Sequence, residues 1–239
     1  MGNEFIRGET LMERVLIVAE GQTEERFIKM ILIPYFQKKG IYNINVSILP
    51  NKILADSSRN KGGDISFKKV ADYVKRLLGS NNFVTTLIDY YGIDKDFKGY
   101  KESLEIPSLD IKSKKELLET ELKKEVNNDK FIPYIQMYEF EGLLFSNPDS
   151  FKYIEDDQNK IESIKKDIAS YQTPEHINNS RITAPSKRLE KYYVGYEKTI
   201  DGINVAEDMG IEIIIKKCPM FKQWIEKIEE ILEESKILL

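Results

Sequence analysis

The segment that most constrains the fold is VLIVAEGQTEE, residues 15–25. Its first half is an uninterrupted apolar run rich in β-branched residues, which is typical of a strand buried on both faces. The run ends at Glu20, and Gly21 permits a sharp turn there. A helix is expected next, with Glu24 and Glu25 in its first turn. Open α/β sheets bind ligands at the carboxyl ends of their strands, so this segment predicts an α/β fold with an acidic functional edge.

Strand and helix patterns alternate through the first 148 residues. Apolar runs predict strands at residues 14–19, 45–49, 83–88 and 131–137. Helical periodicity predicts helices at residues 23–39, 65–78 and 112–126, and the polar segments 51–64 and 92–111 are expected as loops. Pro34 is expected to kink or shorten the first helix. This alternation predicts a parallel sheet of about four strands with right-handed crossovers.

The character of the sequence changes after Pro148. Residues 149–239 show helical periodicity and few strand signals, and we favour helix over strand for the ambiguous residues 211–215. The expected organisation has three parts. These are a loose extension at 1–11, an α/β domain at 12–148, and a helical region at 149–239 that packs on it.

Composition excludes several kinds of chemistry. The chain has one cysteine (Cys218) and one histidine (His176), which excludes structural zinc sites and disulfide frameworks. A Cys218–His176 pair is formally open, but a buried structural cysteine is the favoured interpretation. No GxxxxGK[ST] motif occurs, so the chain is not itself a P-loop ATPase. Any metal ligands must be Asp or Glu, and oxygen ligands select Mg²⁺ or Mn²⁺.

Charge and hydropathy give weaker limits. The net charge of −4 provides no global attraction to nucleic acid, so such binding needs a local basic surface. No apolar stretch approaches the roughly 20 residues of a membrane helix, and the first eleven residues are too polar for a signal peptide. We therefore expect a cytoplasmic protein that does not enter a membrane.

Acidic residues end three of the predicted strands. Glu20 follows the first, Asp89 the third, and Glu139 and Glu141 the fourth. The carboxyl ends of parallel strands share one edge, where these acids repel one another unless a cation neutralises them. Glu139 and Glu141 share a face if the strand continues, but diverge by about 200° if a helix has begun. The alternative is that each acid is a solvated loop residue or lies at a helix N-terminus.

At this point the sequence resembles a known family. VAEGQTEE is similar to the opening motif of Toprim domains, especially those of the overcoming-lysogenization-defect (OLD) nucleases. The remainder resembles an uncharacterised family of bacterial Toprim-like proteins. The matching stretches are TTLIDYYGIDKDFKG (85–99), FIPYIQMYEFEGLLFSNP (131–148), TPEHINN (173–179), APSKRL (184–189) and KKCPMFKQWIEKIEEI (216–231). The resemblance implies a Mg²⁺-dependent phosphodiester enzyme, often encoded beside an ATPase in phage-defence loci.

The resemblance assigns roles to individual residues. It implies that Glu20 is a general acid/base or a metal ligand, that Glu24 is the second acid of the motif, and that Asp89 is the first aspartate of a DxD pair. The second aspartate is absent, because the residue two positions after Asp89 is Tyr91. Its place could be taken by Asp94, Asp96, Glu139 or Glu141. Equally, the site could be degenerate and the protein non-catalytic.

Basic and aromatic residues complete the candidates. Lys187 and Arg188 follow a proline at a predicted helix start, where phosphate is attracted, and the resemblance includes them. A second basic cluster flanks the GGD segment at 62–64 and comprises Arg59, Lys61, Lys68 and Lys69, which could follow a nucleic-acid backbone. An ordinary solvated face is the alternative for both clusters. The tyrosines at 90, 91 and 138 either pack the sheet edge or stack on a base.

The leading hypothesis is metal-dependent cleavage of DNA or RNA. Mg²⁺ or Mn²⁺ is held by Glu20 and Asp89 with Glu139, Glu141 or both, and Lys187 or Arg188 stabilises charge on the phosphate. The competing hypothesis is a degenerate binding or regulatory subunit of an ATPase complex. A phosphotransferase or hydrolase acting on nucleotides is the third. Nucleic acid, an ATPase subunit and a second copy of the chain stay open as partners.

Overall fold

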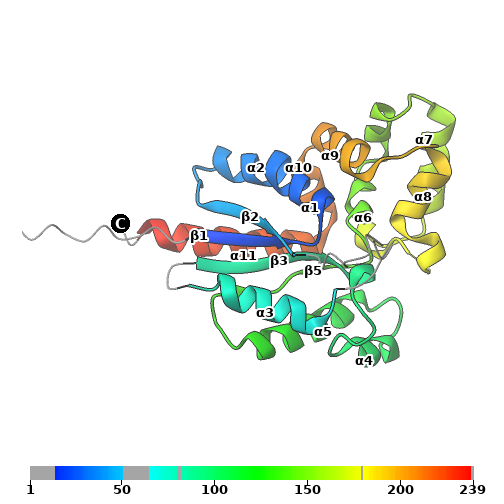
Figure 1. The fold of residues 1–239 in the computed structure, drawn as a ribbon. Helices are drawn as coiled ribbons and strands as arrows, with labels where there is room; N and C mark the ends of the chain where they lie inside the picture. Colours follow the sequence, from blue (N-terminus) through cyan, green and yellow to red (C-terminus); the bar gives the residue numbers. More distant parts are fainter. Residues whose placement is uncertain (1–13, 51–64, 80–81, 179, 238–239) are drawn as a thin grey trace, which may run out of the picture.

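The protein forms a parallel sheet between two layers of helices. The structure, a computed structural model, describes residues 14–50, 65–79, 82–178 and 180–237 (Figure 1). The predicted extension at 1–11, the predicted loop at 51–64, and Arg59 and Lys61 lie outside these residues. No helix in the described ranges is long and apolar enough to cross a membrane.

The sheet confirms the predicted parallel α/β class. Its strands are β1 (Arg14–Ala19), β2 (Ile44–Ile48), β3 (Asn82–Asp89), β4 (Phe131–Ile132) and β5 (Ile135–Gln136). The order is β2-β1-β3-β4, with β5 also on β3, and every pairing is parallel. The carboxyl ends of the strands therefore meet at one edge, which faces α6 (Glu141–Leu144) and the helices beyond it (Figure 1).

The predicted fourth strand is divided into two short ones. Pro133 lies at the break, and proline has no N–H to give to a ladder. The side chain of Thr86 bridges the gap: its hydroxyl donates to Tyr134 O (2.8 Å) and accepts from Tyr134 N (2.9 Å). Strand pairing resumes at Ile135, so the chain still reaches the functional edge in a parallel direction.

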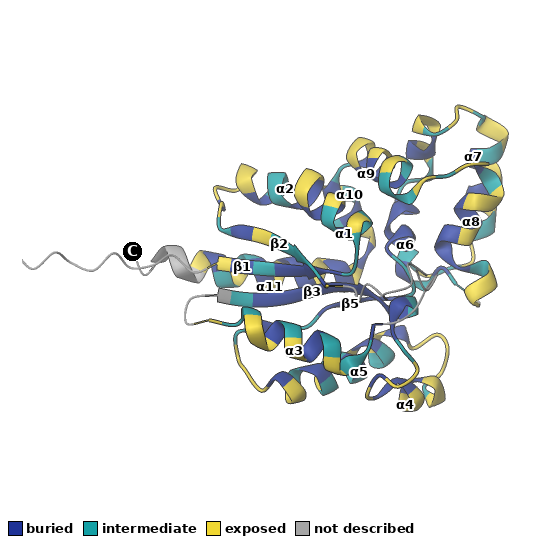
Figure 2. Cartoon of the chain, in the orientation of Figure 1, coloured by how far each residue is buried: buried dark blue, intermediate teal, exposed yellow. Residues whose placement is uncertain are grey.

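Alternating side chains of β1 face two separate hydrophobic cores. Val15, Ile17 and Ala19 belong to one core, and Val18 belongs to the other. The second core packs α3 (Phe67–Leu77) and α5 (Ile111–Val126) on one face of the sheet. On the opposite face lie α1 (Gln22–Phe27), α2 (Ile33–Lys38), α9 (Ile203–Met209), α10 (Ile211–Lys217) and α11 (Pro219–Ile237). Figure 2 shows the buried strands between helices whose outer faces are exposed.

The structure refines two local predictions. A kink or a shortened helix was expected at Pro34, and the helix is not shortened: a π-helical turn, Ile28–Leu32, precedes the proline and the helix runs to Lys38. The segment 92–111 is not simply a loop, because it contains α4 (Tyr100–Glu105), which packs on α5. Its two turns bury only Tyr100 and Ser103, too few positions to register as helical periodicity.

The second half of the chain is helical, as predicted, and residues 211–215 lie in α10. It also contains a 3₁₀ segment Pro148–Tyr153, α7 (Gln158–Ile168), 3₁₀ turns at Pro174–His176 and Arg181–Thr183, α8 (Pro185–Tyr192) and a π-helix Lys198–Gly202. The last helix is fixed to the sheet, because Trp224 Nε1 donates to Thr85 Oγ1 (2.8 Å) and its ring stacks on Tyr134 (4.5 Å). The division of the chain at residue 148 stays a prediction.

Candidate functional site

Glu20 lies where β1 ends, held between the ends of two strands. Its N–H donates to Leu87 O (3.1 Å), which continues the parallel ladder one residue past β1. Its carboxylate turns toward β3, and Oε2 accepts the N–H of Asp89 (2.8 Å). A Cβ at Gly92 would lie 2.4 Å from Glu20 Oε1, so only glycine leaves room for this carboxylate. The backbone at the end of β3 and after it thus binds the Glu20 carboxylate and leaves space for it.

Glu24 is a buried residue in the first turn of α1. Its Oε2 accepts the N–H of Gly21 (2.9 Å), one of the amides that the helix itself leaves without a partner. The predicted alternative, a carboxylate at a helix N-terminus, therefore describes part of its role. Burial, first of all, raises the pKa of Glu24. Glu24 in turn raises the pKa of both Glu20 and Asp89, so it also belongs to the acidic cluster.

Asp89 is the last residue of β3 and is 8% exposed. Its Oδ1 is buried and has no hydrogen-bond partner among the described residues. Burial raises the pKa of Asp89 well above its ordinary value, and the neighbouring Glu20, Glu24 and Glu141 raise it further. An unpaired carboxylate oxygen among three other acids is a costly arrangement for a stable fold.

The two acids that follow the fourth predicted strand diverge. Tyr138 has a left-handed backbone (φ 62°) and α6 begins at Glu141, so the strand has ended by that point. Glu139 Oε2 accepts the N–H of Ser186 (2.9 Å) in the first turn of α8. Glu141 is 1% exposed and its Oε1 lies 2.9 Å from Lys198 Nζ. Glu141 therefore joins the cluster, while Glu139 links α6 to α8.

Lys198 is the cation of the cluster, and sequence reasoning missed it. Burial alone would lower the pKa of Lys198, but Glu141 and Glu139 outweigh that effect and raise it. Lys198 in turn lowers the pKa of Glu20, Glu24 and Asp89. It lies in the π-helix Lys198–Gly202, far from any strand end in the sequence, so no strand-end pattern pointed to it.

Burial dominates the electrostatics of the cluster, and repulsion between the acids adds to it. Burial raises the pKa of Glu20 to about 8, helped by Glu24 and Glu141, although the Asp89 N–H and Lys198 oppose the shift. Burial likewise raises the pKa of Glu141, and Lys198 opposes it. Within the described residues, no three Asp, Glu, His or Cys side chains are already grouped closely enough to hold a metal ion. The cluster is thus rich in oxygen ligands but not closed around one point.

The predicted phosphate-binding residues have other partners. Arg188 is buried, and its guanidinium donates to Asp167 (2.7 Å), to the Tyr171 hydroxyl (2.7 Å) and to the Thr183 carbonyl (3.0 Å). Lys187 is exposed and pairs with Glu190 (2.6 Å). Neither of these contacts involves a carboxylate of the cluster. The cation that pairs with the cluster is Lys198, and a role of Lys187 or Arg188 in phosphate binding stays a prediction.

The other proposed substitutes for a second aspartate also lie apart. Asp94 Oδ1 accepts the N–H of Asp96 (3.1 Å), which stabilises the turn after Gly92. Asp96 is exposed. Among the candidates for the missing aspartate, Glu141 in the first turn of α6 is the one whose charge raises the pKa of Asp89.

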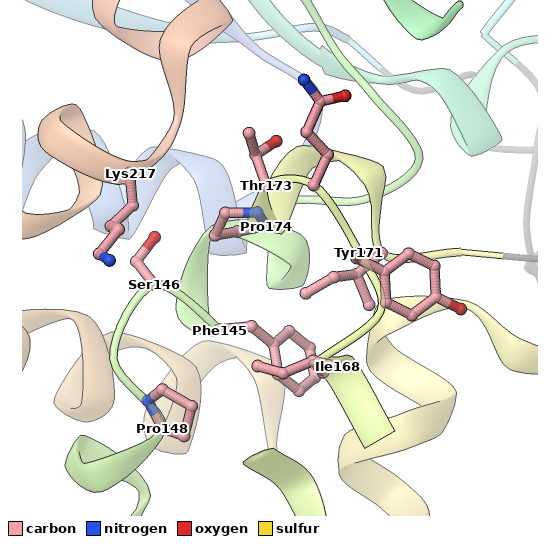
Figure 3. A pocket seen from close by; sticks show the side chains of 10 residues that line it. Phe145, Ser146, Pro148, Ile168, Tyr171, Thr173, Pro174 and Lys217 are labelled. Carbon is pink, nitrogen blue, oxygen red and sulfur yellow. The ribbon is translucent and has the colours of Figure 1, made fainter. Parts of the chain in front are cut away.

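A hollow of about 280 Å³ opens in the helical half of the molecule (Figure 3). Its wall is partly apolar, with Phe145, Ile168 and Tyr171, and partly polar, with Ser146 and Lys217. None of the residues that line it is a carboxylate of the cluster. The acidic site therefore does not open into this hollow.

Fold and site together define a class, a parallel α/β protein with a buried acidic cluster at the carboxyl edge of its sheet. The chain belongs to the family of the domain of unknown function DUF4276, whose profile matches residues 19–229, from the end of β1 into α11. The fold is also similar to the C-terminal region of the Xanthomonas campestris pv. campestris OLD protein. That match has 14% identity and a TM-score of 0.43, over 95% of this chain and 98% of that chain. A similarity of this size decides nothing about the chemistry of the site. No curated protein matches the chain.

Proposed function

We propose that this protein cleaves phosphodiester bonds of nucleic acid with the help of Mg²⁺ or Mn²⁺ at the acidic cluster. The observation that carries the proposal is the buried Oδ1 of Asp89, which has no partner among the described residues and lies among Glu20, Glu24 and Glu141, with Lys198 as their cation. Unpaired buried carboxylates are destabilising, and they are retained where a ligand satisfies them.

The cluster fits a hard divalent cation in the chemistry of its donors. Every candidate ligand is a carboxylate oxygen, which suits Mg²⁺ and Mn²⁺. A bound cation also removes the repulsion that raises the pKa of Glu20 and Asp89. Asp89, Glu20 and Glu141 would hold it, with Glu24 beside them. When bound, such a cation polarises a phosphoryl oxygen and supports water as the nucleophile.

The protein groups around the cluster have separate tasks. The Asp89 N–H and the glycine at 92 fix the Glu20 carboxylate, so that it is held before substrate arrives. The Lys198 ammonium, held by Glu141, provides positive charge beside the acids, where charge develops on a phosphate in the transition state. Glu139 orients the first turn of α8 against α6 and positions this wall of the site.

A nuclease assay tests the proposal. Purified protein is incubated with labelled DNA, RNA and mononucleotides in Mg²⁺ or Mn²⁺, alone and with the ATPase of a neighbouring gene. We expect the double variant Glu20→Gln, Asp89→Asn to lose activity by about a hundredfold or more. Glu25→Gln is the matched control, because Glu25 lies in the same helix turn but pairs with Lys29 on the surface. Full activity in the double variant would remove the cluster from the mechanism.

A second function, a binding or regulatory subunit without catalysis, is favoured by one observation. No three acidic side chains of the described residues converge as metal ligands, and Tyr91 occupies the position of a second aspartate. Calorimetry separates the two functions. Binding of Mn²⁺ with micromolar affinity that is lost in Asp89→Asn supports the enzyme, whereas no divalent cation binding below millimolar concentrations supports the regulatory subunit.

A further inference from the structure

A cluster of four tyrosines lies directly beside the acidic site. Tyr90 and Tyr91 follow Asp89, Tyr138 precedes Glu139, and Tyr100 comes from α4. The Tyr91 and Tyr138 ring centroids are 5.5 Å apart, and Tyr90 contacts both rings and stacks on Tyr100 (5.7 Å). Tyr90 and Tyr100 are buried, whereas Tyr91 and Tyr138 are partly exposed. The buried pair thus supports an outer pair of rings at the edge of the site.

The backbone of Tyr138 indicates that this arrangement does more than fill space. Tyr138 has φ 62°, a conformation that is unfavourable for a bulky L-residue and that Gly or Asn adopts readily. Its carbonyl accepts the N–H of Tyr91 (3.0 Å), which fixes the two residues to each other. Strained residues of this kind concentrate at functional sites. An aromatic ring is therefore held here at a conformational cost.

Tyr91, in the outer pair, also has a cation over its ring and a hydrogen bond to its hydroxyl. The Arg181 guanidinium lies 4.9 Å from its ring centroid, and Asn178 Nδ2 donates to its hydroxyl. Arg181 is exposed, and no carboxylate of the described residues forms an ion pair with it. An arginine over a partly exposed tyrosine ring, without a carboxylate partner in the described part of the chain, is suited to bind a phosphate next to a stacked base.

We propose that Tyr91 and Tyr138 form a stacking platform for an unpaired base next to the scissile phosphate, and that Arg181 binds a flanking phosphate. The substrate is then single-stranded nucleic acid or a frayed end, because bases within a duplex are already stacked and paired. Stacking uses the π-face that every base has, so the platform selects strandedness and not sequence. This proposal rests on the proposed function and names its substrate class.

Equilibrium binding without cleavage tests the platform. Fluorescence anisotropy measures the affinity of the full chain for oligothymidylate and for a duplex, in EDTA. We expect Tyr91→Leu to weaken single-strand binding by about fivefold or more, the contribution of one base–aromatic contact, and to leave duplex binding unchanged. Tyr91→Phe keeps the ring and the affinity. Tyr42→Leu is the matched control, because Tyr42 is 72% exposed and precedes β2 at the opposite edge of the sheet.

Two further variants exclude a general loss of structure. Tyr138→Asn relieves the left-handed backbone, so we expect it to fold at least as stably as the wild type while it weakens single-strand binding. Arg181→Gln weakens binding and reduces its salt dependence, whereas Lys38→Gln, at the exposed end of α2, does neither. An equal loss of duplex and single-strand affinity in Tyr91→Leu, or none in either, would overturn the platform.

The platform and the proposed function fail in different ways. Binding of single strands that depends on Tyr91, without cleavage in Mg²⁺ or Mn²⁺, supports the platform and refutes the nuclease. Cleavage of duplex by both wild type and Tyr91→Leu at equal rates supports the nuclease and overturns the platform.

Discussion

Two buried carboxylates in this molecule, Glu175 and Asp89, differ in how completely the fold satisfies them with hydrogen bonds. Glu175 is 1% exposed, and each of its oxygens accepts a backbone N–H at the start of α11, from Met220 (3.1 Å) and Phe221 (2.8 Å). Asp89 is 8% exposed, but one of its oxygens has no partner in the described part of the chain, and its neighbours are acids.

The difference separates a structural acid from a candidate functional one. Glu175 satisfies the unpaired amides of a helix that carries Trp224 onto the sheet, so its contacts are complete within the fold. The neighbours of Asp89 have partners, since Glu20 and Glu24 accept backbone N–H groups and Glu141 pairs with Lys198, but Oδ1 of Asp89 has none among the described residues. A buried carboxylate oxygen that the described fold leaves unsatisfied makes Asp89 a candidate for binding a ligand.

The largest expected effect is on stability at Glu175. Replacing it with Ala leaves two buried N–H groups without acceptors at the helix that anchors the C-terminal half. We expect the free energy of unfolding to fall by about 3 kcal/mol. Chemical denaturation measures this change, and Glu25→Ala, on the surface beside Lys29, provides the control. A loss similar to that of the control would mean that Glu175 does not hold α11.

The second prediction concerns a divalent cation. A ligand that binds only the folded state at ten times its Kd stabilises that state by about 1.4 kcal/mol. We therefore expect Mn²⁺ to raise the Tm of the wild type and of Glu25→Gln, and to have no effect on Glu20→Gln, Asp89→Asn. Thermal scans with and without EDTA measure this. An equal shift in all three proteins would place the ion elsewhere.

The third prediction follows from the pKa values of the two carboxylate environments. The pKa of Glu20 is raised to about 8 and that of Glu175 to about 7, both above the 4.5 of an unfolded glutamate. Between pH 4.5 and these raised pKa values, the folded state therefore binds more protons than the unfolded state. The stability that this proton binding contributes is complete below pH 4.5 and is lost as the pH rises through the raised pKa values. Without metal, we expect each of the two groups to lower stability by at most about 1.4 kcal/mol per pH unit as the pH rises.

The two carboxylates can be distinguished by their pH windows. Glu20→Gln should flatten the decline between pH 7 and 8, where Glu175 no longer titrates. Glu175→Gln should flatten it only below pH 7. Urea unfolding at several pH values in EDTA measures both slopes, and identical profiles for the two variants would contradict the separate assignments.

Much of this architecture could be predicted from local sequence. The apolar run before Glu20 and the run before Asp89 are long enough to identify buried strands, and their parallel pairing brings the two acids together. The fourth strand was harder, because Pro133 interrupts a ladder that only the Thr86 hydroxyl repairs. These hydrogen bonds join segments that are far apart in the chain, so sequence periodicity cannot predict them.

The composition of the site was only partly predictable for the same reason. Glu139 and Glu141 were equal candidates until the left-handed Tyr138 and the start of α6 separated them. Lys198 and Glu175 act through contacts with segments far away in the chain, so neither forms a local motif. Arg188 looked available for phosphate because its partner Asp167 lies in another helix.

The smallest expected effect tests the comparison most directly. Asp89→Asn removes a carboxylate from the cluster. It also provides an N–H₂ group that can donate hydrogen bonds to the nearby carboxylates. Without metal, we expect this variant to be more stable than the wild type by about 0.5 kcal/mol at pH 8, and by less as the pH falls, because the raised pKa of Asp89 favours its neutral form at lower pH. Glu175→Gln changes the charge by the same amount but puts an N–H₂ group against backbone amides, so it should destabilise the protein.

Urea unfolding measures both variants. Changes of opposite sign in their free energies of unfolding support the division into a structural and a functional acid. A loss of stability in both variants would show that Asp89, too, belongs to the scaffold.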